Sequence, residues 1–309
     1  MKAVDAVIRA RLHSEVLLVR QVAEYIIGSG GKRMRPALLL LAAGATGYEG
    51  KHHHELAAVV EFIHTATLLH DDVVDESALR RGRETANALF GNAASVLVGD
   101  FLYSRAFQMM VEVGSMRIME VLAEATNVIA EGEVLQLMNC RNAEIEVEDY
   151  LRVIRYKTAK LFEASARIGG ILGTATAEVE AGLAAYGMHL GTAFQIIDDV
   201  LDYTGEEEEI GKHLGDDLAE GKPTLPLIIA LQMGRPDQVD LVRQTLELGG
   251  REAFADVLRV VNETGALEAA HAVAVDEAEK AKQALRHLPS SQYRDALINL
   301  CDFAVGRRC

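Results

Sequence analysis

The sequence is poor in residues that interrupt helices and in residues that favour β-sheets. Its 309 residues include no tryptophan, five prolines and only 5% aromatic residues. Proline breaks helix interiors, whereas long stretches without it that are rich in Ala, Leu, Glu and Met favour helix. We find no regular alternation of apolar and polar residues of the kind that half-buried strands show. These absences predict an all-α fold.

Cysteine is also scarce, and its spacing excludes two common uses. Cys140, Cys301 and Cys309 form neither a metal-ligand motif nor a pattern typical of a disulfide framework. Cys309 ends the chain but is not part of a prenylation motif. Reduced thiols are usual in the cytosol, so the sequence predicts a cytoplasmic protein.

Positive charge and long apolar runs are lacking as well. The net charge is −15, and no basic stripe is present, which argues against a nucleic-acid partner. The most apolar run, PALLLLAAGATG, is too short to span a bilayer, so we expect no transmembrane segment. The first residues, MKAVDAVIRARLHSE, are amphipathic and charged, unlike a signal peptide. An anionic substrate would therefore need local Lys, Arg or metal.

What is present suits one large helical bundle. Half of the residues are hydrophobic and 25% are charged, enough for a large core. No linker or low-complexity tract divides the chain, so we expect a single domain over residues 1–309. The longest expected helices are Asp5–Ile27, Glu55–Asp75, Ala93–Val113, Val121–Asn139, Val147–Ile168, Glu180–Tyr203 and Ala266–Leu288. The polar stretch 204–224 is expected to be a loop with short helical pieces.

Two aspartate triplets with identical spacing carry most of the functional information. Asp71, Asp72 and Asp75 lie in TLLHDDVVDE, and a second D-D-x-x-D occurs in FQIIDDVLDY. Its members are Asp198, Asp199 and Asp202. On a helix, residues four apart share a face, so the first and last aspartates of each triplet lie together. Unpaired carboxylates are costly in apolar surroundings, which suggests that cations hold them.

Carboxylate-rich oxygen sites suit hard cations. Mg²⁺ typically bridges one or two carboxylates to substrate phosphates. The triplets therefore predict a cavity in which two carboxylate clusters face each other across a phosphorylated substrate. One D-D-x-x-D alone is weak, since acidic clusters usually lie on solvated helix faces. The second copy, in a matching apolar context, favours the metal site.

Cationic and polar residues lie near both triplets in the sequence. The segment GSGGKRMRP places basic residues on a glycine-rich turn before a helix, where backbone N–H groups and guanidinium groups can bind a diphosphate. Any one of these residues, taken alone, is more often an ordinary surface residue. The candidates are Lys32, Arg33, Arg35, His64, Arg80, Arg81, Lys157, Thr158, Gln195, Lys212 and Lys222.

The motifs together resemble one family. GGKRMRP, HDDVVDESALRRG, the pair Lys157–Thr158 and FQIIDDVLDYTGEEEEIGKHLGDDLAEGKPTLPL, in this order, are similar to the trans-polyprenyl diphosphate synthases. The resemblance covers almost the whole chain. It implies an isoprenoid synthase-type helical bundle around a deep central cavity, Mg²⁺ as cofactor, a homodimer, and a product delivered to the membrane. The implied substrates are isopentenyl diphosphate and an allylic diphosphate.

The resemblance also implies roles for the candidate residues. The allylic diphosphate would be held through Mg²⁺ by the aspartates, Asp71, Asp75 and Asp198 first among them. Asp72, Asp199 and Asp202 are included as metal-ligand candidates, and Asp72 also as a catalytic one. Arg80, Lys157, Thr158 and Lys212 would assist, and Lys222 matches a lysine of a closing loop. The isopentenyl diphosphate ligands would be Lys32, Arg35, His64 and Arg81, and Gln195 and Thr158 would stabilise the allylic cation.

Product length is expected to depend on small residues one helical turn before Asp71. Ala66 and Thr67, about 5.4 Å from Asp71 along the helix, would be too small to block the growing prenyl chain. Leu135 and Met138 are then the candidates for the residues that end its elongation. The alternative is that Ala66 and Thr67 are small only because helices pack closely there. A shorter-chain synthase, making farnesyl or geranylgeranyl diphosphate, also stays open.

Other functions fit less well. A class I terpene cyclase would share the fold and the first motif, but the second D-D-x-x-D and GGKRMRP argue against it. A di-iron bundle needs two E-x-x-H motifs and two further Glu on bundle helices; Glu61 with His64 forms one such motif, and we find no second well-placed copy. A non-catalytic regulatory subunit of a synthase would usually lose one aspartate motif, and both are intact here.

Overall fold

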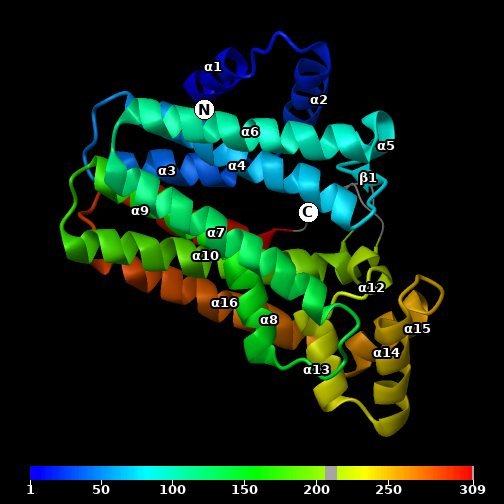
Figure 1. Ribbon diagram of the computed structural model, residues 1–309. Helices are drawn as coiled ribbons and strands as arrows, with labels where there is room; N and C mark the ends of the chain where they lie inside the picture. The colour runs from blue at the N-terminus through cyan, green and yellow to red at the C-terminus, as the bar shows by residue number, and fades with distance from the viewer. Residues whose placement is uncertain (206–213, 308–309) are drawn as a thin grey trace. The chain divides into compact units, whose positions relative to one another are not determined.

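The computed structural model describes residues 1–205 and 214–307, and that part of the chain is almost entirely helical (Figure 1). The all-α class is thus confirmed. The helices of the first half are α1 (Lys2–Arg11), α2 (Leu17–Gly28), α3 (Met34–Ala45), α4 (His52–Val74), α5 (Ala86–Phe90), α6 (Asn92–Val113) and α7 (Met116–Asn139). Those of the second half are α8 (Val147–Ile154), α9 (Lys160–Leu172), α10 (Ala177–Thr204), α12 (Asp216–Ala219), α13 (Leu225–Met233), α14 (Pro236–Leu248), α15 (Phe254–Glu263), α16 (Ala266–Ala284) and α17 (Gln292–Gly306).

The chain folds as two compact units. The first consists of Met1–Thr126, Leu161–Ala184 and Leu285–Leu297, and the second of Asn127–Lys160, Ala185–Ala284 and Ile298–Cys309. Because the boundaries fall inside α7 and α10, no linker separates the units in the sequence. The single domain over residues 1–309 stays a prediction.

In the first unit, α4 is the central helix and packs against α3 and α6 (Figure 1). It is apolar on nearly all sides, as expected for a helix with neighbours all round. Close packing also requires small residues: a Cβ at Gly169 would lie 2.5 Å from the Cβ of Ala42 on α3. Neither α4 nor any other helix of the described residues is long and apolar enough to cross a lipid bilayer.

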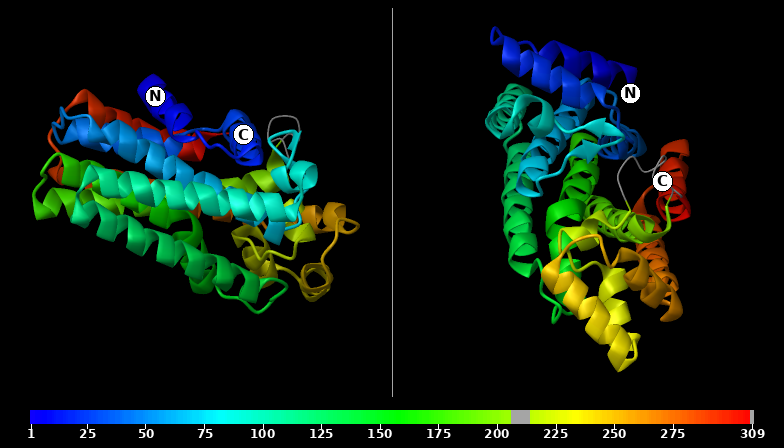
Figure 2. Two further views of the ribbon diagram at one scale, coloured as in Figure 1. Left: turned by 45° about the horizontal axis from the view of Figure 1, so that its top comes forward. Right: turned by 90° about the vertical axis from the view of Figure 1, so that its right-hand side faces the viewer.

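The N-terminal region departs from the prediction of one helix over Asp5–Ile27. The structure has α1 and α2 with a turn between them (Figure 2). In that turn the N–H of Val16 donates to Oγ of Ser14 at 3.2 Å. Serine side chains compete in this way with helical backbone bonds, and this competition was missed because no Gly or Pro marks the break.

A short hairpin follows the first aspartate triplet, and the sequence reasoning did not predict it. Strands β1 (Leu79–Arg80) and β2 (Arg83–Glu84) pair antiparallel, with Leu79 opposite Glu84 and Arg80 opposite Arg83. The two-residue loop has positive φ at both Arg81 (55°) and Gly82 (71°). Two such residues are the signature of a type I′ turn, so the local backbone fixes where the arginines of this loop emerge.

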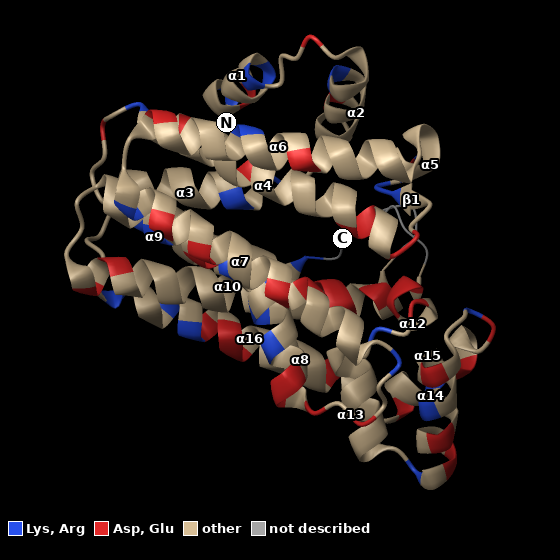
Figure 3. Ribbon diagram, in the orientation of Figure 1, with Lys and Arg blue, Asp and Glu red and all other residues tan. Residues whose placement is uncertain are grey.

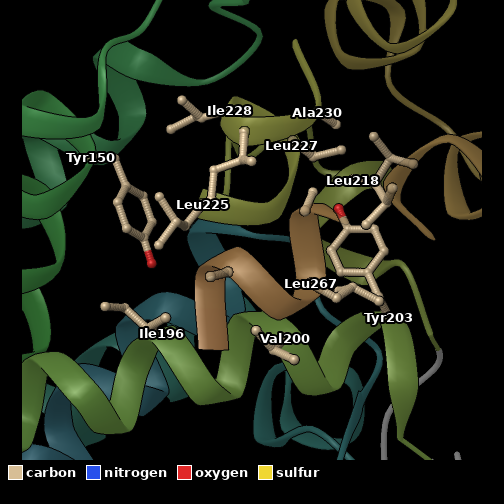
Figure 4. Close-up of a cluster of buried hydrophobic side chains, with 14 of the residues drawn as sticks. Tyr150, Ile196, Val200, Tyr203, Leu218, Leu225, Leu227, Ile228, Ala230 and Leu267 are labelled. Carbon is tan, nitrogen blue, oxygen red and sulfur yellow. The ribbon is translucent and has the colours of Figure 1, made fainter. Parts of the chain in front are cut away.

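The second unit has its own apolar core, formed by residues of α8, α10, α12, α13, α14, α15 and α16, part of which Figure 4 shows. The predicted helix Val147–Ile168 runs through this region but is not regular. A π-helical segment, Arg155–Ala159, separates α8 from α9. Such segments occur often at functional sites, and this one carries Lys157 and Thr158.

Candidate active site

The first aspartate triplet lies at the C-terminal end of α4, in the first unit. Asp71 and Asp75 are half-buried, whereas the side chain of Asp72 is fully buried. The N–H of Asp75 donates to the carbonyl of Asp71 at 2.8 Å, so the helical spacing extends to the last aspartate. Asp71 and Asp75 therefore share a partly exposed helix face, and Asp72 points elsewhere.

Asp72 is held by the hairpin. Both Nε and Nη2 of Arg80 contact its Oδ1, at 2.8 and 2.7 Å. Burial raises the pKa of the Asp72 carboxyl, against the opposing effect of Arg80. The amide of Asn87 also donates to the backbone carbonyl of Asp72 at 3.1 Å. Asp72 thus ties the end of α4 to the loop that carries the arginines.

The glycine-rich turn before α3 comes close to this hairpin. Gly30 and Gly31 both have positive φ, and the guanidinium of Arg81 donates to the carbonyl of Gly30. A Cβ at Gly31 would lie 2.9 Å from Nη1 of Arg81, so only glycine allows this approach. Arg33, at the N-terminus of α3, has φ of 50°, which orients the start of that helix.

Neighbouring side chains hold Arg33 and Arg35, which lie at the start of α3. Nη1 of Arg33 lies 2.5 Å from Oε1 of the buried Glu61, and its Nη2 donates to the carbonyl of Ile27 at 3.2 Å. Nη1 of Arg35 lies 3.1 Å from Nε2 of His64, and its guanidinium stacks 4.6 Å from the centre of the Phe162 ring. Glu61 and His64, the E-x-x-H pair of α4, therefore each hold an arginine.

His64 is neutral in this setting. Its pKa lies well below the ordinary value, first because it is buried and then because Arg35, Arg81, Arg80 and Arg33 surround it. A guanidinium only donates, so Nε2 of His64 must accept and the ring proton belongs on Nδ1. This concentration of positive charge beside a helix N-terminus is suited to a diphosphate.

The second triplet lies near the end of α10, in the second unit, and its first member is paired. Oδ1 of Asp198 lies 2.6 Å from Nη1 of Arg307, whose side chain is 1% exposed. Arg307 also donates to the carbonyl of Phe194 at 2.7 Å and stacks over its ring. The Asp198 side chain is 40% exposed, so it can still reach a ligand.

Asp199 is buried among hydrogen-bond donors. Tyr150 donates to its Oδ2 at 2.6 Å, and Nε2 of Gln195 donates to its Oδ1 at 2.9 Å. In turn, Thr158 donates to Oε1 of Gln195 at 2.9 Å. Burial raises the pKa of Asp199 to about 8, with Asp217 adding to the rise and the Tyr150 and Gln195 hydrogen bonds opposing it.

Asp202 supports the segment that follows. Its fully buried side chain accepts the N–H of Asp217 at 3.3 Å, and its carbonyl accepts the N–H of Gly215 at 3.0 Å. These contacts fix the start of α12, on which Asp216 and Asp217 add further negative charge (Figure 3). Asp202 thus organises an acidic region at the end of α10.

Lys157 projects from the π-helical segment toward α7. Its Nζ lies 2.5 Å from Oε2 of Glu133 and 2.8 Å from Oε1 of Gln136. The two segments can be this close because of a glycine: a Cβ at Gly132 would lie 2.6 Å from the backbone nitrogen of Lys157. The structure therefore brings Lys157, Thr158 and Gln195 together within the second unit.

The two lysines of the loop after α10 are placed differently. Nζ of Lys222 lies 2.6 Å from Oε2 of Glu220, and its side chain is 13% exposed. Its backbone N–H donates to the carbonyl of Asp217 at 2.7 Å. Lys212 lies outside the described residues, so its expected role stays a prediction.

The candidate chain-length residues lie in unlike surroundings. Ala66 is fully buried, and Thr67 is half-buried with its hydroxyl donating to the carbonyl of His64 at 2.8 Å. Leu135 is half-buried, whereas Met138 is 73% exposed in the single chain. Their roles in product length stay predictions.

The donor set fits Mg²⁺. Among the residues that the structure describes, no three acidic, histidine or cysteine side chains converge as a ready ligand set. Mg²⁺ needs fewer, because it usually keeps waters and binds one or two carboxylates together with substrate phosphates. Asp71 and Asp75, one helical turn apart and partly exposed, meet that requirement.

Three residues of these sites were missed by sequence reasoning. Glu61 anchors Arg33, Tyr150 binds Asp199, and Arg307 pairs with Asp198. Tyr150 is 49 residues from its partner and Arg307 is 109 residues from its own. No local spacing in a single sequence signals such pairs.

Comparisons with known proteins agree with the motifs. The family model "Polyprenyl synthetase" matches residues 16–264. The octaprenyl diphosphate synthase of Escherichia coli (strain K12) is 56% identical over 308 residues, which cover 99% of this chain and 95% of that protein. The all-trans-nonaprenyl-diphosphate synthase (geranyl-diphosphate specific) of Rhodobacter capsulatus is 47% identical, with 99% of this chain and 94% of that protein covered.

Solved structures match equally well. The polyprenyl synthase from Caulobacter crescentus CB15, complexed with calcium and isoprenyl diphosphate, superimposes with a TM-score of 0.97 at 45% identity. The match covers 100% of this chain and 95% of that one. The resemblance stated from the motifs and the isoprenoid synthase fold are both confirmed. The chain belongs to the polyprenyl synthetase family.

Proposed function

We propose that this protein is a Mg²⁺-dependent trans-prenyltransferase that makes a long-chain all-trans polyprenyl diphosphate, octaprenyl diphosphate, for the side chain of ubiquinone. The starter is an allylic diphosphate, farnesyl diphosphate, and the extender is isopentenyl diphosphate. One observation carries the proposal: within the first unit, the partly exposed Asp71 and Asp75 lie at the C-terminal end of α4, the helix that also carries a neutral His64 surrounded by arginines. That arrangement suits a metal-held diphosphate and a directly bound one.

The arginine-rich group is assigned to isopentenyl diphosphate. Lys32, Arg35 and Arg81 hold the diphosphate, and the neutral His64 orients Arg35 by accepting its hydrogen bond. Charge-assisted hydrogen bonds from guanidinium groups are short and strong, and they position the diphosphate geometrically. This leaves the double bond of the extender available for attack.

The aspartates divide into two groups. Asp71, Asp75 and Asp198, which are partly exposed, are assigned as metal ligands. Asp72, Asp199 and Asp202 are buried and accept hydrogen bonds from the protein, so we assign them to orienting the site. The six ligands expected from the sequence thus narrow to three in this proposal.

The reaction proceeds by ionisation of the allylic C–O bond. When bound, Mg²⁺ neutralises charge on the departing diphosphate. Arg80, Lys157 and Lys212 add positive charge at the same group, and donors placed where charge develops lower the barrier. The double bond of isopentenyl diphosphate then attacks the allylic carbon. Loss of a proton to the released diphosphate gives an allylic diphosphate that is longer by one isoprene unit. The dipoles of Thr158 and Gln195 are assigned to stabilising the allylic cation. Lys222 is assigned to the closing loop.

The direct test is product analysis. Pure protein is incubated with Mg²⁺, farnesyl diphosphate and isopentenyl diphosphate, and the products are identified by mass spectrometry. Octaprenyl diphosphate is the expected main product. Farnesyl or geranylgeranyl diphosphate as the final product would instead identify a short-chain synthase, and a hydrocarbon product would identify a terpene cyclase.

Substitutions of the basic residues should separate the two substrates. Lys32→Ala and Arg35→Ala are expected to raise the KM for isopentenyl diphosphate more than the KM for farnesyl diphosphate, and Arg80→Ala the reverse. Each lost charge-assisted contact costs about 1.5–3 kcal/mol, or roughly 10- to 100-fold. Steady-state kinetics with each substrate varied in turn measure both constants.

Arg83→Ala is the matched control, because Arg83 is an exposed arginine of the same hairpin that stacks on Tyr25. It should leave both KM values unchanged. Since Arg80 also neutralises the buried Asp72, the melting temperature of Arg80→Ala must be measured beside its kinetics. Equal changes in both KM values for every variant would contradict the assignment of the two diphosphates.

The protein is further assigned as a cytoplasmic homodimer that passes its product to the membrane. Exposed apolar side chains support the dimer. On α6, Leu97 is 67% and Val111 is 64% exposed, and a spacing of fourteen residues puts them on one face. On α7, Val134, Leu137 and Met138 are each more than half exposed at helical spacing. Large apolar side chains that are exposed in a single chain often lie in an interface.

The dimer can be tested by placing one charged side chain on the exposed apolar face of α6. Leu97→Glu is expected to convert the protein to a single chain of 33.6 kDa, as measured by size-exclusion chromatography with light scattering. Leu248→Glu is the matched control, since Leu248 is 77% exposed at the end of α14, away from either apolar face in the sequence. A wild-type protein that elutes as a monomer, or a Leu97→Glu variant that stays dimeric, would remove this assignment.

A further inference from the structure

The start of α2 exposes three consecutive large apolar side chains, which we call the apolar corner. Val16, Leu17 and Leu18 are 58%, 58% and 46% exposed. Val16 is the N-cap residue of α2 and no side chain caps the helix there, although Ser, Thr, Asp or Asn is usual at this position. Single exposed apolar residues are normal, but three in a row that neither fill the core nor cap the helix indicate an interaction surface.

The apolar corner is attached to the folded first unit on both sides. On the α1 side, Val4 and Ile8 are buried, with 0% and 1% of their surface exposed. From α6, Arg105 donates to the backbone carbonyl of Arg11 at 2.7 Å and to that of His13 at 3.4 Å. These contacts fix the turn that leads into α2, so the exposure of the corner is a property of the native fold.

The charge around the corner differs in sign from that of the chain. The first twenty residues carry a net charge of +2, whereas the whole chain carries −15. The charged residues among the twenty are Lys2, Arg9, Arg11, Arg20, Asp5 and Glu15. Arg9 is exposed in the last turn of α1, and Arg20 shares a face of α2 with Val16 and Leu17 (Figure 3). Nε of Arg20 has no hydrogen-bond partner among the residues that the structure describes.

The size and the charge of this surface favour a lipid bilayer over a protein partner. A stable interface between two protein chains typically buries about 800 Å² on each of them, which three side chains cannot supply. A bilayer surface requires less, because a few apolar side chains enter the headgroup region while Lys and Arg meet anionic phosphates. The corner offers both features, in a chain whose net charge would otherwise repel an anionic membrane.

We propose that the apolar corner and the basic residues beside it form the surface by which this protein docks on an anionic lipid bilayer. The inference goes beyond the proposed function, which names a membrane as the destination of the product but no surface that reaches it. Docking is reversible, because even a single myristoyl chain gives an association constant of only about 10⁴ M⁻¹. The protein would therefore exchange between solution and membrane.

The first test uses the absence of tryptophan from the chain. Leu17→Trp places a single indole at the corner, and its fluorescence reports whether it leaves water. Vesicles of phosphatidylcholine mixed with phosphatidylglycerol should shift its emission to the blue, and vesicles of phosphatidylcholine alone should not. The shift should decrease in 1 M salt, where the Debye length is about 3 Å instead of about 10 Å at 0.1 M. Leu248→Trp is the matched control, since Leu248 is 77% exposed at the end of α14, and its emission should not change.

The second test measures binding without a fluorophore, by sedimentation with the same mixed vesicles. Leu17→Glu should lower the partition coefficient by about 10- to 100-fold, since a Leu side chain no longer leaves water. Arg9→Glu changes the charge by two and should lower it by roughly 30-fold. Both residues are exposed, so the melting temperature should stay near that of the wild type. Leu248→Glu should bind as the wild type does.

Four outcomes would overturn the inference. These are wild-type protein that does not sediment with the mixed vesicles, a Leu17→Trp variant without a blue shift, an equal shift in Leu248→Trp, and a Leu17→Glu variant that elutes as a single chain from a dimeric wild type. The last would assign the corner to a second copy of this chain. Neither test requires turnover, so a failure here leaves the product analysis of the proposed function unaffected, and the reverse also holds.

Discussion

Asp71→Ala is expected to abolish prenyl transfer while leaving the fold intact. Asp71 is partly exposed and is assigned to metal binding, so its loss removes electrostatic stabilisation of the leaving diphosphate. Removing one such group typically costs about 10²–10³-fold in rate, and metal ligands often cost more. The rate is measured with saturating Mg²⁺ and both substrates, and helicity and melting temperature are measured on the same samples.

The corresponding change in the second unit needs a different design. Asp198 balances the charge of Arg307, whose side chain is 1% exposed. Asp198→Ala would leave that guanidinium buried without its carboxylate, which generally destabilises the fold. Asp198→Asn keeps an oxygen at the same place and removes only the charge, so it is the cleaner substitution. It too should lower the rate by about 10²–10³-fold.

Controls separate metal loss from general effects of charge. Asp237→Ala removes an aspartate whose side chain is 72% exposed on α14, and it should behave as the wild type. EDTA should stop the wild-type reaction, and added Mg²⁺ should restore it, whereas Ca²⁺ should substitute poorly because its larger shell is held more loosely. Product formation at the wild-type rate by Asp71→Ala or Asp198→Asn would remove the central claim about the triplets.

Sequence reasoning could predict the fold class and the main motifs because these depend on local patterns. Helix propensity and the scarcity of proline are properties of short segments, and so is the D-D-x-x-D spacing. The same local logic placed Lys32 and Arg35 on a turn leading into a helix; in the structure α3 begins at Met34, so Lys32 precedes the helix and Arg35 lies in its first turn. Each of these features depends on residues within a few positions of one another.

The parts that could not be predicted depend on distant contacts or on backbone competition. The two triplets have the same spacing, yet Asp72 meets Arg80 whereas Asp199 meets Tyr150 and Gln195. Which aspartate is buried depends on the elements packed around each helix, and spacing carries no information about that. The π-helical segment and the break between α1 and α2 likewise arise where tertiary packing or side-chain hydrogen bonds override propensity.

Thr67→Phe is expected to shorten the product sharply. Thr67 lies one helical turn before Asp71 on the same face, about 5.4 Å along the axis, where a growing chain would pass. It is only half-buried, and its hydroxyl is already bonded within the helix, so its methyl group presents an apolar surface. A benzyl group there should block elongation after the first condensations, and mass analysis should show short-chain diphosphates in place of octaprenyl diphosphate.

Ala66→Phe is expected to have the same effect but is the weaker test. Ala66 is fully buried, and overpacking a buried site typically costs about 1–3 kcal/mol of stability. A short product from Ala66→Phe would therefore support the chain-length role only if the melting temperature of that variant equals that of the wild type. Its burial also fits the alternative that this residue is small for helix packing, whereas the half-buried Thr67 is less constrained.

The matched control and the distal stop complete the chain-length test. Thr67→Val keeps the size and removes the hydroxyl, so it should still give the full-length product. Met138→Ala should permit longer products, but Met138 is 73% exposed in the single chain, so this requires a partner subunit to cover it. In the Leu97→Glu background, which is expected to be monomeric, Met138→Ala should then no longer lengthen the product. Leu135 is half-buried within the single chain, so Leu135→Ala should lengthen the product with or without Leu97→Glu. Full-length product from both Thr67→Phe and Ala66→Phe would show that the growing chain does not pass these two residues.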